Sequence, residues 1–137
     1  MNITYDNRKE LPCGGLVNLF RAVGWSDGSE TEEMLAHFNL PFLHSTFVFS
    51  AWDGETLVGC VRALSDRIFR SVIYDLAVLP EYQGRGIGSE LIRLCISECP
   101  SSEWLLATIP ERAGFYEKLG FSPFTQPVMQ IPCKWFK

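Results

Sequence analysis

The sequence predicts a single α/β (α+β) domain over residues 1–137, with a mixed, mostly antiparallel sheet of about six or seven strands flanked by about four helices. Three observations lead to this fold class. Hydrophobic residues recur with helical spacing in some segments and with strand spacing in others. An Asp-Gly turn separates two strand-like runs. A glycine-rich stretch joins an apolar strand to an amphipathic helix. A chain of 137 residues is also the usual size of one domain.

The N-terminal third predicts one short strand followed by two helices. The strand is expected over residues 2–5. Apolar residues at helical spacing predict a helix over residues 11–23. A second helix is expected to take Ser29 as its N-cap, because Glu32 three residues later completes a capping box. Pro41 is expected to mark the end of that helix.

The centre of the chain changes to strand spacing. Residues 46–52 and 56–64 are rich in β-branched and aromatic side chains, and Asp53-Gly54 between them predicts a hairpin. Residues 71–79 are apolar on both faces, which predicts a buried central strand.

The last third alternates again between the two kinds of structure. An amphipathic helix is expected over residues 87–98 and a strand over residues 104–109. A short helix should follow over residues 111–119. Two closing strands are expected over residues 121–124 and 128–135.

Composition excludes several classes of protein. Hydrophobic residues make up 47% of the chain, so a packed core is expected. The net charge of −4 argues against nucleic acid as a partner, and no apolar run approaches a membrane span. The N-terminus has no signal-peptide pattern, so we expect a cytoplasmic protein with reduced thiols. No metal site is expected, because no zinc-ligand spacing joins the five cysteines: Cys13, Cys60, Cys95, Cys99 and Cys133.

The stretch of glycines at positions 84, 86 and 88 predicts a phosphate-binding turn. Glycine lets backbone N–H groups approach a ligand, and a helix start adds unpaired donors and partial positive charge. The stretch lacks the Lys-Ser/Thr pair of a Walker A loop. It also fails the dinucleotide pattern, because Ser89 stands where the third glycine belongs. A glycine-rich turn without any ligand is the alternative.

Two motifs resemble signatures of the GNAT superfamily, the acyl-CoA-dependent N-acyltransferases. Gln83, Gly86 and Gly88 fill that family's pyrophosphate-loop pattern, and the preceding residues 77–82 are typical of it. Residues 113–121 resemble its C-terminal signature. The order of the expected elements is also that of the GNAT fold. The resemblance covers nearly the whole chain, and it implies acetyl-CoA (CoA) as cosubstrate.

The resemblance also implies where the cosubstrate would lie. A central strand splayed at the CoA site would let the backbone around Leu76, Ala77 and Val78 pair with the pantetheine. One N–H group there would polarise the thioester carbonyl. The pyrophosphate would bind the loop made of Gln83, Gly84, Arg85, Gly86, Ile87, Gly88 and Ser89.

Tyr116 is the first candidate catalytic residue. The resemblance implies that this tyrosine protonates the departing CoA thiolate. A phenol has a pKa of about 10 and a thiol of about 8.5, so the phenol stays protonated at neutral pH. The alternative is a core tyrosine that only packs beside the cofactor.

Asp75 is the second candidate, because it interrupts an apolar strand. Strand alternation places Tyr74 and Asp75 on opposite faces. The carboxylate would hold the amine substrate or take its proton. Alternatively it has a structural role, such as pairing with Arg62 or Arg67.

The acceptor is the open part of the prediction. Ile109 stands where many members have a CoA-contacting Asn, and the region resembles a subgroup that includes arylalkylamine-type and uncharacterised bacterial members. We expect acetyl transfer to a small-molecule primary amine by direct attack in a ternary complex. A protein lysine or N-terminal acetyltransferase, and a silent CoA-binding regulatory domain, remain alternatives, and a homodimer stays open. Five aromatic residues would line an acceptor pocket or belong to the core: Phe38, Phe42, Phe47, Phe49 and Trp52.

Overall fold

One sheet of five strands organises most of the chain, in the order β1-β2-β3-β4-β5. β1 to β4 pair antiparallel with their neighbours, and β5 pairs parallel with β4. The computed structural model describes residues 2–135, and within this range the sheet has five strands where six or seven were predicted. The mixed, mostly antiparallel α/β class is confirmed. The strands are Ile3–Asp6, Phe47–Asp53, Thr56–Ser65, Arg70–Val78 and Glu103–Leu105.

The chain divides into two compact units, Met1–Ala107 and Thr108–Lys137. All five strands belong to the first unit. In the second, a 3-10 turn (η2, Pro110–Arg112) leads into helix α5 (Ala113–Glu117), and no further helix or strand follows as far as residue 135. The expectation of one domain over residues 1–137 stays a prediction.

The two predicted closing strands, residues 121–124 and 128–135, are therefore wrong for the described chain. A strand needs the backbone groups of a neighbour to pair with, and an apolar pattern does not supply that neighbour. Val128, Met129 and Ile131 are 84–90% exposed, so this segment also buries little apolar surface within the structure.

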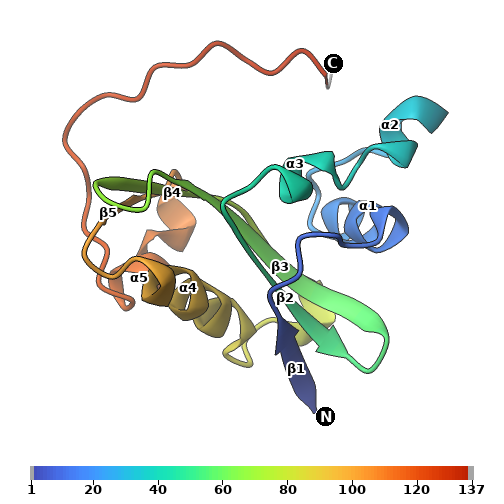
Figure 1. The fold of residues 1–137 in the computed structure, drawn as a ribbon, viewed down its shortest axis with the longest axis horizontal. Helices are drawn as coiled ribbons and strands as arrows, with labels where there is room; N and C mark the ends of the chain where they lie inside the picture. The colour runs from blue at the N-terminus through green and yellow to red at the C-terminus, as the bar shows by residue number, and fades with distance from the viewer. Residues whose placement is uncertain (1, 136–137) are drawn as a thin grey trace. The chain divides into compact units, whose positions relative to one another are not determined.

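The helices cover both faces of the sheet. Three lie on one side, α1 (Cys13–Ala22), α2 (Glu32–Ala36) and α3 (Leu40–Leu43), and α4 (Ile87–Glu98) lies on the other (Figure 1). α1 packs on β3 and β4, whereas α4 packs on β2, β3 and β4. The predicted boundaries of α4 match the observed ones.

The start of the second helix differs from its prediction. Thr31, not Ser29, is the N-cap, and its Oγ1 accepts a hydrogen bond from the Met34 N–H at 3.2 Å. The helix begins at Glu32, so that residue is too early to complete the predicted capping box. Pro41 lies inside the first turn of α3 rather than ending α2, because the first turn of a helix does not use the N–H that proline lacks.

Gly59 of β3 sets how closely α4 approaches the sheet. A Cβ built there would lie 3.3 Å from Ile87 and Leu91 side-chain atoms and from the Ala77 carbonyl oxygen. Ile87 and Leu91 belong to the first two turns of α4 and are buried. The side chain that Gly59 lacks therefore lets the start of α4 sit directly on β3 and β4.

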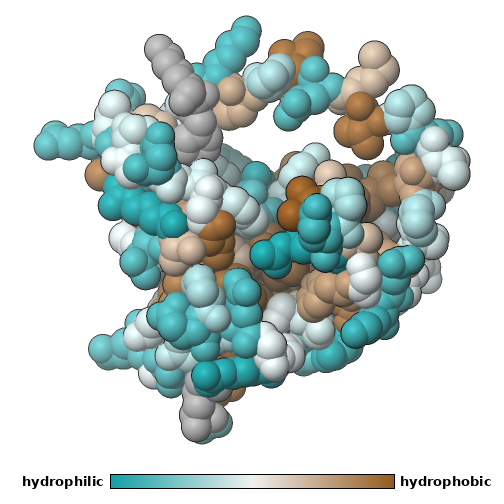
Figure 2. All heavy atoms as spheres, turned by 180° about the vertical axis from the view of Figure 1, so that it is seen from behind, coloured by the Kyte–Doolittle hydropathy of each residue, from teal (hydrophilic) through white to brown (hydrophobic). Residues whose placement is uncertain are grey.

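The aromatic residues considered for an acceptor pocket are mainly part of the core. Their exposed fractions are at most 9%: Phe38, Phe42, Phe47, Phe49 and Trp52. The surface is different in character. Polar side chains dominate the face shown in Figure 2, and apolar ones reach it in separate places.

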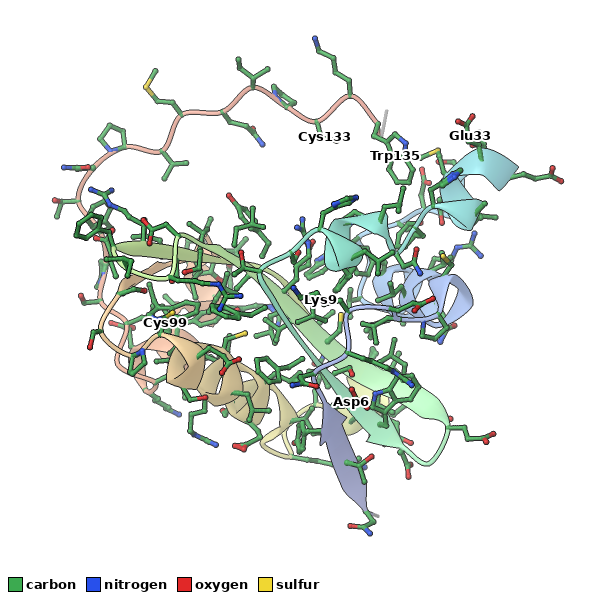
Figure 3. The ribbon with its side chains drawn as sticks, in the orientation of Figure 1. Asp6, Lys9, Glu33, Cys99, Cys133 and Trp135 are labelled. Carbon is green, nitrogen blue, oxygen red and sulfur yellow. The ribbon has the colours of Figure 1, made fainter. Side chains whose placement is uncertain are left out.

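All five cysteines are free thiols within the described residues. Cys60 and Cys95 are buried, and Cys99 follows α4 (Figure 3). Burial raises the pKa of Cys95 to about 12 and raises that of Cys60 as well. Between residues 2 and 135, no helix is both long enough and apolar enough to cross a bilayer.

Candidate functional site

The glycine-rich loop joins the end of β4 to the start of α4. Gly84 and Gly86 have φ angles of +77° and +84°, and nothing lies within 4 Å of a Cβ built at either. Residues other than glycine rarely adopt such φ angles. The loop therefore exposes backbone, with open space beside it, as a phosphate-binding turn requires.

Three contacts fix this loop to the sheet. The Gln83 amide donates from Nε2 to the Val78 carbonyl oxygen at 2.9 Å. Tyr82, in the short 3-10 turn Pro80–Tyr82 (η1), donates its hydroxyl to Asp53 Oδ2 at 2.6 Å. Ile87 is buried at the far end. Gln83 stays a prediction for cofactor binding: its side chain bonds to Val78, and its backbone remains part of the exposed loop.

The N-terminus of α4 provides the donors of the site. Gly86 is its N-cap, and no side chain caps the helix. The first N–H groups of a helix have no intrahelical acceptor and carry partial positive charge. A 12-residue helix that opens onto an exposed glycine loop suits a diphosphate, so the residues present fit the phosphate part of CoA.

The strand before the loop has an open edge. β5 pairs with β4 only through Arg70, Ser71 and Val72. Over the rest of β4, as far as Val78, no described strand pairs with that edge. An extended ligand could pair with the unpaired backbone like an added strand.

β4 also contains a bulge. Cys60 pairs with Ala77 and Arg62 pairs with Tyr74, so β4 has one more residue than β3 between these pairs. Asp75 lies in the bulge with a φ of +53°. The irregular backbone falls where the splayed strand was expected, beside Leu76 and Ala77.

Asp75 is paired with Arg62. Arg62 Nε donates to Asp75 Oδ2 at 2.5 Å, and both side chains are mostly buried, with 20% and 30% exposed. The Arg62 guanidinium also lies 5.4 Å from the ring centre of Tyr74. Tyr74 and Asp75 thus contact the same cation, so the predicted strict alternation of their faces is wrong. The bulge turns the backbone between them.

Arg62 and Ser45 complete this cluster. Arg62 Nη1 donates to Ser45 Oγ at 3.4 Å, and its guanidinium lies 5.9 Å from the ring centre of Phe42. Sequence reasoning named Arg62 only as one of two partners for Asp75 and missed Ser45. Strand register would have identified Arg62, because it lies opposite Tyr74 on the neighbouring strand.

Tyr116 lies on α5, in the second unit. Its ring packs edge-on against Phe115 and Phe121, with ring centres 4.9 and 5.9 Å away. Burial raises the pKa of the phenol, and the nearby positive charge of Arg112 opposes this effect. The hydroxyl therefore keeps its proton at neutral pH, as a general acid for a thiolate must.

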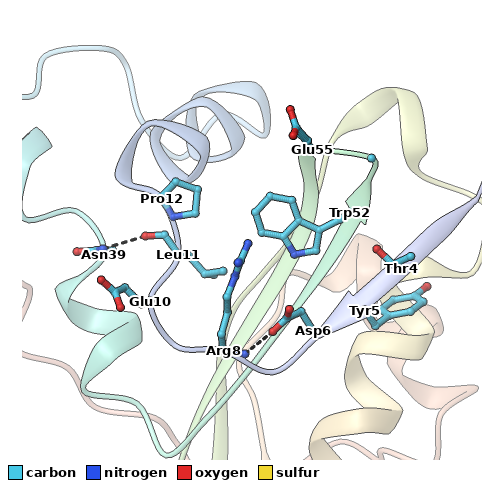
Figure 4. Close-up of a pocket in the computed structure, with 11 residues that line it drawn as sticks. Thr4, Tyr5, Asp6, Arg8, Glu10, Leu11, Pro12, Asn39, Trp52 and Glu55 are labelled. Atoms are coloured by element: carbon cyan, nitrogen blue, oxygen red, sulfur yellow. Dashed lines mark hydrogen bonds between the residues drawn. The ribbon is translucent and has the colours of Figure 1, made fainter.

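A separate open hollow of about 950 Å³ lies in the first unit between β1, the start of α1 and the β2–β3 turn (Figure 4). The Arg8 guanidinium stacks 4.7 Å from the ring centre of Trp52 inside it. Asp6, Glu10 and Glu55 contribute carboxylates. The hollow includes none of the predicted catalytic or cofactor-binding residues, and of the five aromatic residues considered for an acceptor pocket it includes Trp52.

Comparison with known proteins identifies the class of protein that this fold and loop define. The acetyltransferase (GNAT) domain family matches residues 44–123, which include the bulge, the loop and Tyr116. The chain belongs to the GNAT acetyltransferase family, and it is an acetyltransferase. Members of this family use acetyl-CoA as cosubstrate.

Individual relatives agree with this assignment. An uncharacterized N-acetyltransferase, ycf52, of Porphyra purpurea is 30% identical over 127 residues, covering 88% of this chain and 70% of that protein. A rice protein named serotonin N-acetyltransferase 2, chloroplastic, is 30% identical over 82% of this chain and 57% of its own length. A GNAT-family acetyltransferase structure from Streptococcus pneumoniae TIGR4 superposes with a TM-score of 0.79 at 29% identity, covering 97% of this chain and 99% of that one.

Proposed function

We propose that this protein transfers the acetyl group of acetyl-CoA to a small-molecule primary amine, by direct attack while both substrates are bound. The observation that carries the proposal is the continuous backbone surface formed by the open edge of β4, the glycine loop and the N-terminus of α4. One end of this surface suits an extended amide chain and the other suits a diphosphate.

Bound acetyl-CoA supplies the thioester carbon that the amine attacks. In the proposed mechanism, the loop from Gln83 to Ser89 binds the diphosphate, and Leu76, Ala77 and Val78 offer backbone groups to the pantetheine. A backbone N–H of the bulge polarises the carbonyl. The new C–N bond forms as the C–S bond breaks, and Tyr116 gives its proton to the leaving sulfur. The amine loses a proton to solvent or to a nearby base.

The acceptor class is supported by relatives and by the surface near Asp75. The rice relative named for serotonin matches 82% of this chain, while a soybean protein named histone acetyltransferase TAP1 matches 49% of it, at 37% identity. Tyr74, 45% exposed, and Leu64, 41% exposed, offer apolar contacts on the two strands that carry Asp75 and Arg62. Such contacts suit an amine with an apolar body.

The test combines a binding assay with a transfer assay. CoA should raise the melting temperature of the purified chain, and free thiol should appear when acetyl-CoA is mixed with arylalkylamines. Faster transfer to lysine peptides than to any small amine would favour the protein-acceptor alternative. Binding of CoA without transfer to any acceptor would favour the silent regulatory domain. No binding of CoA would reject the proposal altogether.

We also propose a reducing compartment such as the cytoplasm. All five cysteines remain free thiols in the described structure, and persistent disulfides mark oxidising compartments. Fractionation of cells that express the tagged chain would test this, with recovery in an oxidising compartment as the contrary result.

A further inference from the structure

The bulge in β4 holds a residue in a backbone conformation that its type adopts only occasionally. Asp75 has a φ of +53°, and the only other residue besides glycine with a positive φ in the described chain is Arg67. Such a conformation persists only where the surroundings hold it. The contacts that hold Asp75 therefore also hold the bulge.

Arg62 supplies the principal contact. Its Nε donates to the Asp75 carboxylate, and Ser45 Oγ and the Tyr74 ring fix the rest of the guanidinium. In a regular strand, Tyr74 and Asp75 would point to opposite faces. Here one guanidinium contacts both, which is compatible only with the turned backbone of the bulge. The Arg62 side chain thus bridges β3 to the irregular part of β4.

We propose that Arg62 is a positioning residue for acetyl transfer, acting through Asp75 to hold the β4 bulge and so to aim the backbone N–H groups beside it at the thioester. This inference rests on the proposed function. It assigns Asp75 a positioning role as well, in place of the base or amine anchor considered from sequence. Arg62 engages Oδ2 of this carboxylate from β3 and is itself held by three other groups, so its fixed positive charge opposes a cationic amine beside Asp75.

The test compares substitutions that keep or remove the Arg62–Asp75 pair and the backbone conformation at Asp75. Asp75→Asn keeps an acceptor oxygen for Arg62 and a residue type that tolerates positive φ. It should retain at least a third of the wild-type kcat/KM, with the same pH profile. Asp75→Ala loses both properties, and Asp75→Gly relieves the backbone but loses the pair. Both variants should have a kcat/KM for acetyl-CoA at least tenfold lower than wild type. If the alanine variant does not fold, Asp75→Gly still tests the loss of the ion pair.

Arg62 is tested in the same assays. Arg62→Met should lower kcat/KM at least tenfold. Combining it with Asp75→Gly should lower kcat/KM by no more than about threefold beyond the worse single variant, because both substitutions remove the same ion pair. Arg70→Met is the matched control. Arg70, at the start of β4, pairs with Glu103 of β5 at 3.7 Å, and 73% of its side chain is exposed, so its loss should leave kcat/KM unchanged.

Two results would overturn the inference. One is an Asp75→Asn variant as impaired as Asp75→Ala and lacking the acidic limb of the pH profile, which would make Asp75 a base. The other is wild-type kcat/KM in Arg62→Met. A wild-type chain that binds CoA but transfers nothing would instead count against the proposed function. In that case the CoA dissociation constants of the same variants still test whether Arg62 holds the bulge. We expect Arg62→Met to bind CoA about tenfold more weakly than wild type, and equal affinity would contradict the inference.

Discussion

The role of the glycine loop can be tested with a pair of substitutions at matched backbone angles. Gly86 has a φ of +84° at the start of α4, and Gly24 has a φ of +85° just after α1. Nothing lies within 4 Å of a Cβ built at either position. Aspartate at either site should therefore cost similar strain, on the order of 1–2 kcal/mol. Only Gly86→Asp would also place a negative charge in the proposed diphosphate site.

The size of the effect on CoA follows from Coulomb's law. Two charge pairs at about 4 Å cost about 1 kcal/mol each even at the dielectric constant of water. The combined loss of about 2 kcal/mol corresponds to roughly thirtyfold weaker binding. We therefore expect Gly86→Asp to raise the CoA dissociation constant at least thirtyfold, and Gly24→Asp to leave it within about twofold of wild type.

A thermal-shift assay can measure this difference. CoA at a hundredfold excess over its dissociation constant stabilises the folded wild type by about 2.7 kcal/mol, and a thirtyfold weaker site at the same concentration gives about 0.9 kcal/mol. With an unfolding entropy of about 0.29 kcal/mol/K for a chain of this length, these correspond to shifts of about 9 °C and 3 °C. Equal shifts in the two aspartate variants would refute the assignment of the diphosphate to this loop.

Three further predictions follow from particular contacts. Gly59→Ala should lower the free energy of unfolding by about 1–3 kcal/mol and weaken CoA binding, because the new methyl group would push on Ile87 at the start of α4. Denaturant titration measures the first effect and calorimetry the second. Unchanged CoA affinity would mean that this packing does not influence the site. Tyr116→Phe should lower kcat at least about tenfold and move the alkaline limb of the pH–rate profile, whereas wild-type kcat would leave Tyr116 as packing. Burial raises the pKa of the Cys95 thiol to about 12, whereas the unfolded thiol has a pKa of about 8.5. The contribution of this thiol to stability is therefore complete below about pH 8.5, and the free energy of unfolding falls by about 1.4 kcal/mol per pH unit from there to about pH 12. Cys95→Ala should flatten this part of the curve of stability against pH, and an equally steep curve in the variant would show that Cys95 is not its cause.

Local signals account for what the sequence predicted correctly. The hairpin at Asp53-Gly54 and the helix Ile87–Glu98 depend on neighbouring residues, and both appear as expected. The bulge was expected only through family resemblance. Its effect on Tyr74 and Asp75 could not be derived, because strand alternation assumes a regular backbone. A single residue at positive φ was enough to bring two consecutive side chains to one guanidinium.

Predictions that depended on distant partners fared differently. Thr31 is the N-cap rather than Ser29, although both residue types satisfy the local rule; Glu30 between them bonds to Arg21 and Ser26, contacts that the capping pattern does not predict. The strands expected over residues 121–124 and 128–135 needed a neighbouring strand that the pattern cannot specify. The Arg62–Asp75 pair similarly joins residues 13 apart across two strands. Its geometry became visible only with the register.

The two candidate catalytic residues call for different kinds of evidence. Asp75 lies in the sheet, where its partner is already visible, so a conservative substitution separates chemistry from positioning.

Tyr116 lies on α5 of the second unit, and its raised pKa follows from burial rather than from any hydrogen bond. The phenol is fully protonated at neutral pH, as the acid role requires. Its raised pKa nevertheless makes it a weaker acid than a thiol of pKa about 8.5, so proton transfer to the thiolate is uphill unless another interaction offsets it. The acid role therefore requires the raised pKa to be offset as the thiolate forms, either by the positive charge of Arg112 or by the thiolate's own desolvation, which makes it more basic. Replacing Arg112 with Met should then raise the phenol pKa further and lower kcat more than it raises the KM for acetyl-CoA. A change in KM alone would mean that Arg112 serves binding and that Tyr116 does not depend on it.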